Sequence, residues 1–183
     1  MYKFHYDFIK PKYKDAAKLL FTDTDSLCYS LATDCVYKDL RENAHLFDFS
    51  EYPKDHPNYS ATNARVLGRF KDECHGVQPI EFVGLRSKMY SLLIPSDTGE
   101  KQKATAKGIK TSFAKKHLKH ELYKKCLFDE TTTSATYYQI GSKNHTLRTN
   151  KIVKSALSPY DDKRYLLTGS TDSLPFGHYK IPK

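Results

Sequence analysis

Hydrophobic residues near the start of the chain follow first a helical and then a strand-like spacing. Five aromatic and aliphatic residues between positions 2 and 9 recur at helical intervals, which predicts a helix over residues 2–10. We expect Pro11 to end this helix, because the residue before a proline avoids the helical backbone conformation. Apolar runs at residues 17–21 and 26–31 then flank the sequence Thr-Asp-Thr-Asp, and this pattern predicts two strands joined by an Asp-rich turn.

The middle of the chain alternates between polar loops and short apolar runs. Thr33 or Asp34 can cap a short helix that reaches about Asn43. Residues 48–63 are rich in Pro, Asp, Asn and Ser, which predicts a loop. Strands are predicted at residues 66–70, 80–85 and 88–94, with a turn at the Pro-Ser-Asp-Thr-Gly sequence of residues 95–99.

The last third of the chain combines one helical pattern with further strands. Phe113, Leu118, Leu122 and Cys126 recur at four- to five-residue steps, which predicts one amphipathic helix with lysines on its outer face. Strands are predicted at residues 137–140 and 147–157. The elements together predict an α+β fold, with an antiparallel sheet and flanking helices in residues 1–100 and a second subdomain in residues 101–183.

The charge of the chain changes sign near residue 100. The net charge is +9, but residues 1–100 carry −2 and residues 101–183 carry +11. Residues 101–125 alone hold nine lysines and one acid, Glu121. This asymmetry favours a polyanionic partner for a basic C-terminal subdomain, although a lysine-rich surface that serves only solubility would show the same composition.

Composition narrows the class of protein. Hydrophobic residues make up 39% of the 183 residues, too many for a disordered chain, and no apolar run approaches the roughly 20 residues that cross a bilayer. The N-terminal sequence lacks the apolar core of a signal peptide. Cys28, Cys35, Cys74 and Cys126 are scattered and match neither a zinc site nor a disulfide framework. We therefore expect an intracellular protein of the nucleus or cytoplasm, neither secreted nor bound to a membrane.

The Asp-rich turn is the first candidate for chemistry. Asp23 and Asp25 are two positions apart at the tip of a predicted hairpin, where an extended backbone would place both carboxylates on one face. Mg²⁺ prefers oxygen ligands and often takes only one or two protein carboxylates together with substrate phosphates. An ordinary acidic turn would have the same sequence, because Asp and Thr are common in turns.

Basic residues supply the second candidate. Arg86, Lys88 and Tyr90 alternate within the predicted strand pair, which would present them on one face, where they could contact the phosphates and sugars of a duplex. Such charges also protect a solvent-facing strand edge from aggregation. Seven further lysines could release counterions on binding a phosphate backbone: Lys101, Lys103, Lys107, Lys110, Lys115, Lys116 and Lys119.

These motifs, in this order, resemble the C-terminal part of family B DNA polymerases. The likeness is closest to the protein-primed branch carried by large self-replicating transposons of the Maverick/Polinton type and by related viruses and plasmids. Asp-Thr-Asp-Ser at residues 23–26 is similar to motif C, and Lys-Met-Tyr at residues 88–90 is similar to the Lys-x-Tyr motif. Lys-Gly-Ile-Lys at residues 107–110, with the helix after it, and the tail at residues 157–165 resemble the thumb region. The resemblance covers nearly the whole chain.

The resemblance implies an antiparallel palm followed by a thumb-like subdomain, and it implies roles for individual residues. Asp25 would be a direct ligand of two catalytic Mg²⁺ ions, and Asp23 would support it. Lys88 and Tyr90 would hold the primer terminus. The partners would be duplex primer–template DNA, a deoxynucleoside triphosphate and a terminal protein primer, and the reaction would be two-metal phosphoryl transfer.

Three motifs of the family are not found in this chain. They are motif A (Asp-x-x-Ser-Leu-Tyr-Pro), the fingers motif (Lys-x-x-x-Asn-Ser-x-Tyr-Gly) and the Asp-x-Glu exonuclease motif, all of which lie upstream of motif C in the family. The expectation is therefore a fragment of a longer enzyme, or a truncated relic, that does not synthesise DNA alone. Two alternatives stay open: a non-enzymatic, basic nucleic-acid-binding remnant, and a glycosyltransferase that uses Asp-x-Asp to hold a metal-bound nucleotide sugar.

Overall fold

The protein has a mixed α+β fold with small antiparallel sheets, as the sequence predicted. A computed structural model describes residues 1–97, 99–160, 164–170, 172–175 and 177–181. By packing, the chain forms two compact units: unit 1 holds residues 1–82 and 92–103, and unit 2 holds residues 83–91 and 104–183. Their sequences carry formal net charges of −2 and +11 respectively. A functional division near residue 100 stays a prediction.

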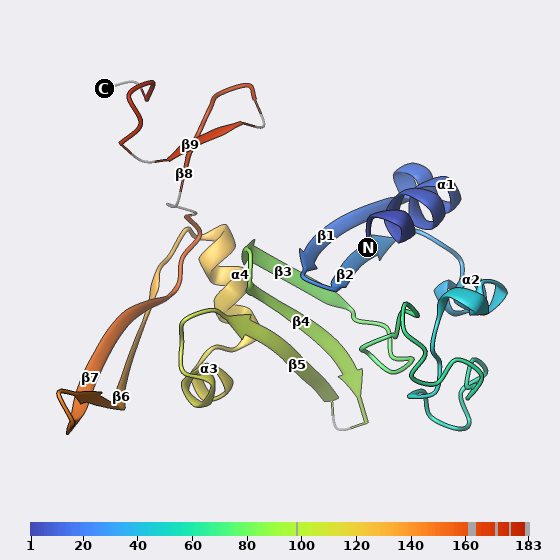
Figure 1. The fold of residues 1–183 in the computed structure, drawn as a ribbon, viewed down its shortest axis with the longest axis horizontal. Helices are drawn as coiled ribbons and strands as arrows, with labels where there is room; N and C mark the ends of the chain where they lie inside the picture. The colour runs from blue at the N-terminus through green and yellow to red at the C-terminus, as the bar shows by residue number, and fades with distance from the viewer. Residues whose placement is uncertain (98, 161–163, 171, 176, 182–183) are drawn as a thin grey trace. The chain divides into compact units, whose positions relative to one another are not determined.

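Most of the elements are short, and residues 47–80 form a long loop between the second 3-10 turn and the first strand of the next sheet (Figure 1). In chain order they are a π-helical turn (Phe4–Ile9), α1 (Lys10–Tyr13), a 3-10 turn (Lys14–Ala16), β1 (Ala17–Asp23), β2 (Ser26–Leu31), α2 (Val36–Glu42), a 3-10 turn (Ala44–Leu46), β3 (Glu81–Arg86), β4 (Met89–Ser96), β5 (Gly99–Ala106), α3 (Thr111–His117), α4 (His120–Phe128), β6 (Thr133–Lys143), β7 (Thr146–Leu157), β8 (Arg164–Leu166) and β9 (Ser173–Pro175). Within the described ranges, no helix is both long enough and apolar enough to cross a membrane.

The N-terminal helix continues past Pro11, so the predicted end at this proline is wrong. Pro11 lies in the first turn of α1, directly after the π-helical turn Phe4–Ile9. A proline ring inside a regular α-helix clashes with the carbonyl group four residues earlier. The wider π-helical turn, in which the Lys10 N–H reaches the carbonyl oxygen of His5, relieves that clash and lets the helix continue.

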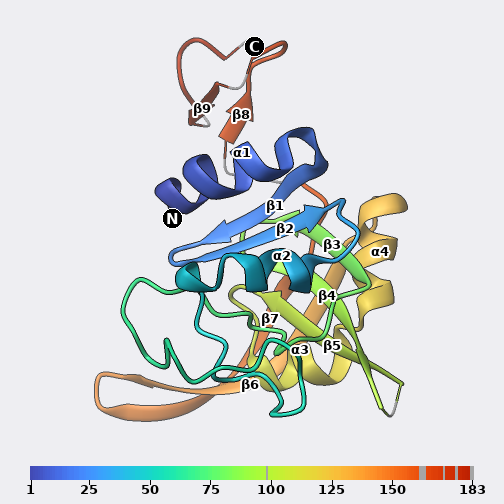
Figure 2. The same ribbon diagram turned by 90° about the vertical axis from the view of Figure 1, so that its right-hand side faces the viewer.

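The predicted hairpin of unit 1 is confirmed. β1 and β2 pair in antiparallel fashion from Ala17↔Leu31 to Asp23↔Ser26, with a bulge near Leu19. The N-terminal helical segment lies alongside this hairpin in both views (Figures 1 and 2), and the imidazole of His5 hydrogen-bonds the hydroxyl of Tyr29 over 2.8 Å. The helix therefore supports the strands that lead to the acidic turn.

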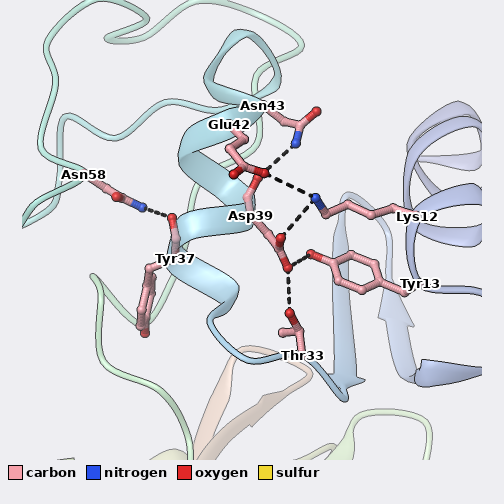
Figure 3. Close-up of polar contacts among 8 residues, drawn as sticks. All are labelled: Lys12, Tyr13, Thr33, Tyr37, Asp39, Glu42, Asn43 and Asn58. Atoms are coloured by element: carbon pink, nitrogen blue, oxygen red, sulfur yellow. Dashed lines mark hydrogen bonds and ion pairs between the residues drawn. The ribbon is translucent and has the colours of Figure 1, made fainter.

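Helix α2 begins after Cys35, so neither Thr33 nor Asp34 caps it as predicted. The Thr33 hydroxyl instead donates to the carboxylate of Asp39, 2.8 Å away (Figure 3). The helix ends at Glu42, near the predicted position of Asn43. A hydroxyl that already serves a side chain of the helix is not available to its first backbone N–H groups.

Asp39 joins α2 to α1 through a cluster of polar contacts (Figure 3). The Tyr13 hydroxyl donates to the Asp39 carboxylate over 3.0 Å, and Lys12 forms an ion pair with the same carboxylate at 3.0 Å. Burial alone would raise the pKa of Asp39, but hydrogen bonds from Thr33, Lys12 and Tyr13 outweigh it and hold that pKa below its ordinary value. The amide of Asn43 also donates to the Asp39 backbone carbonyl.

Aromatic rings fill the core of unit 1. Phe47, Phe49 and Tyr52 are buried, and Phe4 and Phe8 from the N-terminal segment pack against them. Residues 48–63 form the predicted loop, which is tied to α2 where the Asn58 amide donates to the Tyr37 carbonyl (Figure 3).

The strand predicted at residues 66–70 does not form. Positive φ angles at Arg65 and Gly68 bend the chain there, and Leu67 is 96% exposed. Only a single parallel bridge joins Phe70 to Phe47. An apolar run alone therefore did not suffice, because the backbone does not stay extended long enough to pair.

The predicted strands at residues 80–85 and 88–94 are confirmed as β3 and β4, but β5 was not predicted. The three strands form one sheet in the order β3-β4-β5. β4 runs through Pro95 to Ser96, so the predicted turn is shorter, and Thr98 within it lies outside the described residues. β5 is rich in lysine and small residues, so its strand conformation comes from pairing rather than from an apolar pattern.

The helix predicted around residues 113–126 is two helices, α3 and α4, which meet at Leu118 and Lys119. Phe113 and Leu118 are five residues apart, so a straight helix would place them about 140° apart around its axis. The break lets both pack on one core, in which Leu118 is 2% exposed. The five-residue step therefore marked the end of a helix rather than a continuing face.

Unit 2 is built on a core that includes the base of a long two-stranded ribbon, β6–β7. Tyr123, Cys126, Ala135, Ala156 and Leu157 are all fully buried in this core. The strands predicted at residues 137–140 and 147–157 are confirmed and form this gently curved ribbon, drawn in orange in Figure 1. In the tail, β8 pairs with β9, while residues 161–163 of the predicted thumb-like segment lie outside the described residues.

Replacing Asp39 with asparagine should lower the free energy of unfolding by about 1–3 kcal/mol at neutral pH, because the buried Tyr13 hydroxyl, Thr33 and Lys12 lose a charged acceptor. Because folding lowers the pKa of Asp39, its carboxylate stabilises the fold fully when the pH is above the ordinary pKa of 3.8. This contribution is lost as the pH falls through the pKa of Asp39 in the folded protein. The difference between the wild type and Asp39→Asn should therefore shrink below about pH 4. Urea unfolding across a pH series measures this difference in stability, and Asp34→Asn, at an exposed position, is the control. A difference that persisted unchanged in acid would contradict this role for Asp39.

Candidate nucleic-acid interface and acidic turn

Asp23 and Asp25 lie at the tip of the β1–β2 hairpin in unit 1. Asp23 is the last residue of β1, and Asp25 is the second residue of the two-residue turn. Thr24 between them has φ 53°, in the left-handed region, so the backbone is not extended as the prediction assumed. Strand alternation therefore does not place the two carboxylates on one face, and that part of the prediction is wrong.

Hydroxyl groups organise this acidic turn. The Thr24 hydroxyl donates to the Asp23 carboxylate over 3.3 Å, and the Ser26 hydroxyl donates to the Asp23 carbonyl over 3.0 Å. Asp25 is exposed, whereas Asp23 is half-buried. The side chains of the turn offer only oxygen atoms as possible metal ligands, and Mg²⁺ prefers oxygen ligands. Across the described ranges, no group of three or more His, Cys, Asp or Glu side chains could hold a metal ion.

Arg86, Lys88 and Tyr90 belong to unit 2 but do not share one strand. Arg86 ends β3, Lys88 lies in the turn with φ 58°, and Tyr90 follows in β4. The predicted alternation on one face is therefore wrong, because the turn reverses the chain between Arg86 and Tyr90. Burial raises the pKa of the Cys126 thiol, and the positive charge of nearby Arg86 offsets only part of this increase.

Four of the lysines predicted to bind DNA, Lys101, Lys103, Lys107 and Lys110, are divided between the units. Lys101 and Lys103 lie on the part of β5 that belongs to unit 1, and Lys103 forms an ion pair with Glu73. Lys107 and Lys110 follow β5 in unit 2. The Lys107 N–H donates to the carbonyl of Lys88 over 3.1 Å. The fold thus brings Lys107 beside the Lys88 turn, which the sequence had presented as a separate motif.

An open hollow of about 540 Å³ lies where the segment after β5 meets the ribbon of unit 2. Its lining residues are Gly108, Ile109, Lys110, Thr111, Tyr137, Gln139 and Lys154. The ammonium group of Lys110 donates to the carbonyl of Tyr138 over 3.3 Å, and that of Lys154 donates to the carbonyl of Gly108 over 3.5 Å. None of the lining residues is acidic, so the hollow is a positively charged environment.

Lys154, Tyr137 and Gln139 were not singled out from the sequence. One signal was available, because residues 131–160 contain Lys143, Arg148, Lys151 and Lys154 but no Asp or Glu. What was missing was the pairing of β6 with β7, which decides which of these side chains share a face.

Comparison with protein-family models, with curated proteins and with solved structures found no match.

The acidic turn should hold Mg²⁺ no more tightly than about 1 mM, because two carboxylates without further ligands make a weak site. Isothermal titration of the 183-residue chain with MgCl₂ measures this affinity. Asp25→Asn should remove the residual binding, whereas Asp55→Asn, an exposed change in the loop of unit 1, should leave it unaltered. Micromolar affinity would mean that the chain supplies ligands beyond Asp23 and Asp25.

Proposed function

We propose that the chain is the palm-and-thumb portion of a family B DNA polymerase and that it binds duplex primer–template DNA. The observation that carries this proposal is the position of Asp23 and Asp25 at the tip of a tight hairpin, in a chain whose second compact unit has a net charge of +11. The order of the motif C-like turn and the Lys-Met-Tyr sequence adds support. The exposed turn gives a large substrate access to the carboxylates.

In this proposal Asp25 is the direct metal ligand and Asp23 supports it. Asp25 is exposed at the turn, whereas Asp23 accepts the hydroxyl of Thr24. Bound Mg²⁺ would activate the primer hydroxyl and stabilise the leaving group. Two carboxylates from one hairpin cannot clamp two ions as residues from two strands do, so we propose that synthesis needs further ligands, together with a nucleoside triphosphate and a terminal protein primer.

Unit 2 would hold the DNA. Phosphate contacts by lysine and arginine fix a duplex without reading its sequence. Lys88 and Tyr90 would hold the primer end, and the backbone contact between Lys107 and Lys88 places a further cation beside that turn. Since the N–H of Lys107 is used in this contact, its ammonium group is the part that would reach a phosphate.

A non-enzymatic nucleic-acid-binding protein is the second candidate, and the charge of unit 2 favours it directly. It needs the basic residues but makes no use of Asp25. The glycosyltransferase alternative is less well supported, because the sheets that the structure describes are small and antiparallel, whereas a nucleotide-binding α/β domain is built on a parallel sheet.

Binding to duplex DNA should weaken at least a hundredfold between about 50 and 200 mM salt, as expected for roughly four to six phosphate contacts. Lys107→Gln with Lys110→Gln should reduce the slope of log affinity against log salt by about 0.9 for each phosphate that is no longer neutralised. Lys101→Gln with Lys103→Gln removes equal charge but should reduce the slope less, because Lys103 pairs with Glu73. Fluorescence anisotropy across a salt series measures both. A flat response of the wild-type chain would refute DNA binding.

Lys88→Gln should weaken binding to a primer–template junction about fivefold at 100 mM salt but binding to blunt duplex less than twofold, because it removes the cation that neutralises a phosphate at the primer end. Tyr90→Ala should show the same preference. Anisotropy with the two DNA forms measures this, and Lys54→Gln in the loop of unit 1 is the matched control. Equal losses on both forms would remove the primer-end role while leaving DNA binding intact.

A further inference from the structure

The β6–β7 ribbon has two chemically different faces. Paired residues of an antiparallel ribbon lie on the same face, and successive residues alternate between faces. The register Tyr137↔Ile152, Gln139↔Asn150 and Gly141↔Arg148 therefore defines an inner face. The inner face consists of Tyr137, Gln139, Gly141, Lys143, Thr146, Arg148, Asn150, Ile152 and Lys154, and the outer face consists of Thr136, Tyr138, Ile140, Ser142, Leu147, Thr149, Lys151 and Val153.

Positive charge is concentrated on the inner face. Lys143, Arg148 and Lys154 all belong to it, and each is exposed. The amides of Gln139 and Asn150 lie opposite each other between these cations. The outer face has one cation, Lys151, and its apolar side chains are solvent-exposed: Tyr138 62%, Ile140 72%, Leu147 75% and Val153 65%. The whole ribbon contains no carboxylate to neutralise the inner face.

The inner face continues into the positively charged hollow. Tyr137, Gln139 and Lys154 of the inner face line the hollow together with Gly108 and Lys110 of the segment after β5. Lys110 and Lys154 donate to neutral carbonyl groups at 3.3 and 3.5 Å, which are long contacts for an ammonium group. An anion could displace these contacts at small cost, since a charge-assisted hydrogen bond is about twice as strong as one to a neutral acceptor.

We propose that the inner face of the ribbon, together with the hollow at its base, binds the phosphate backbone of duplex DNA. This inference rests on the proposed function, and it identifies the surface and the orientation of the ribbon. The outer face would point away from the DNA. The cations that would contact the phosphates are Lys154, Arg148 and Lys143. All three lie outside the motifs on which the polymerase resemblance is based.

The dimensions of the ribbon favour a duplex over a small anion. β6 has 11 residues, so it extends about 36 Å, close to one turn of duplex DNA. Lys154 lies opposite Ala135, and Lys143 lies eight residues further along β6, so the cations span about 27 Å. A single phosphate could not reach both Lys154 and Lys143, so the whole array fits an extended polyanion better than a small anion.

Lys151 and Lys154 provide a matched test, because both are exposed lysines of β7 on opposite faces of the ribbon. Lys154→Gln should weaken duplex binding about fivefold to tenfold at 100 mM salt and reduce the salt slope by about 0.9. Lys151→Gln should change affinity less than twofold. Arg148→Gln combined with Lys143→Gln should lower the slope further. Fluorescence anisotropy with the full chain measures binding, and thermal unfolding of each variant shows whether it is folded.

The outcomes separate this inference from the proposed function. If the wild-type chain does not bind DNA, both fail. If it binds with a steep salt slope but Lys154→Gln behaves as wild type, or if Lys151→Gln costs as much as Lys154→Gln, the ribbon assignment is refuted and the proposed function stands. Phosphatidylserine vesicles provide the last comparison: capture as strong as that by DNA, with the same dependence on Lys154, would reassign the inner face to a membrane surface and overturn the inference.

Discussion

Burial of the base of the β6–β7 ribbon against helix α4 is the interaction on which the arrangement of unit 2 depends. Ala135 and Ala156 have no exposed surface, and they share a core with Tyr123 and Cys126 of the helix. Small side chains at these two positions let the helix approach the strands closely. The Tyr123 hydroxyl donates to the carbonyl of Thr105 over 3.0 Å, so the helix is also fastened to β5, and burial raises the pKa of this phenol to about 12. A larger residue at Ala135 or Ala156 would force these elements apart.

The same anchoring explains why the inner face of the ribbon is mostly polar beyond its base. Ala135 is buried and Tyr137 half-buried, whereas Gln139 is exposed, so contact with the core ends within a few residues along β6. Past that point the strands satisfy their backbone groups by pairing with each other and need no further layer. The segment 107–110 lies beside the ribbon near this transition, where the Tyr137 hydroxyl and the Lys154 ammonium group both contact the Gly108 carbonyl. The positive hollow is thus formed where the core gives way to solvent.

Local patterns in the sequence identified elements whose stability is itself local. The apolar runs on either side of Asp23 and Asp25 predicted the hairpin, because strand pairs joined by two-residue turns depend on nearby residues. β5 was missed because Lys101, Gln102 and Lys103 give no apolar alternation, and its conformation comes from its neighbour β4.

The details of the candidate sites were less predictable than the elements. The left-handed conformations of Thr24 and Lys88 are not favoured by either residue type, so the sequence suggested an extended backbone at both. The faces of the ribbon were likewise hidden, because a shift of one residue in the pairing of β6 with β7 would exchange them. The sequence therefore identified the chemical character of the sites but not which side chains share a surface.

Charge is nearly balanced in unit 1 and strongly unbalanced in unit 2. In unit 1, Lys12 pairs with Asp39 and Lys71 with Glu51, and Lys103 pairs with Glu73. The sequence of unit 2 has 17 lysine and arginine residues but six carboxylates, so its cations outnumber its anions almost threefold. Concentrated charge of one sign destabilises a compact unit through self-repulsion and attracts counterions. A polyanion that replaces those counterions relieves the repulsion and gains the entropy of their release. The charge that costs unit 2 stability when it is free is therefore the same charge that would drive it to bind a nucleic acid.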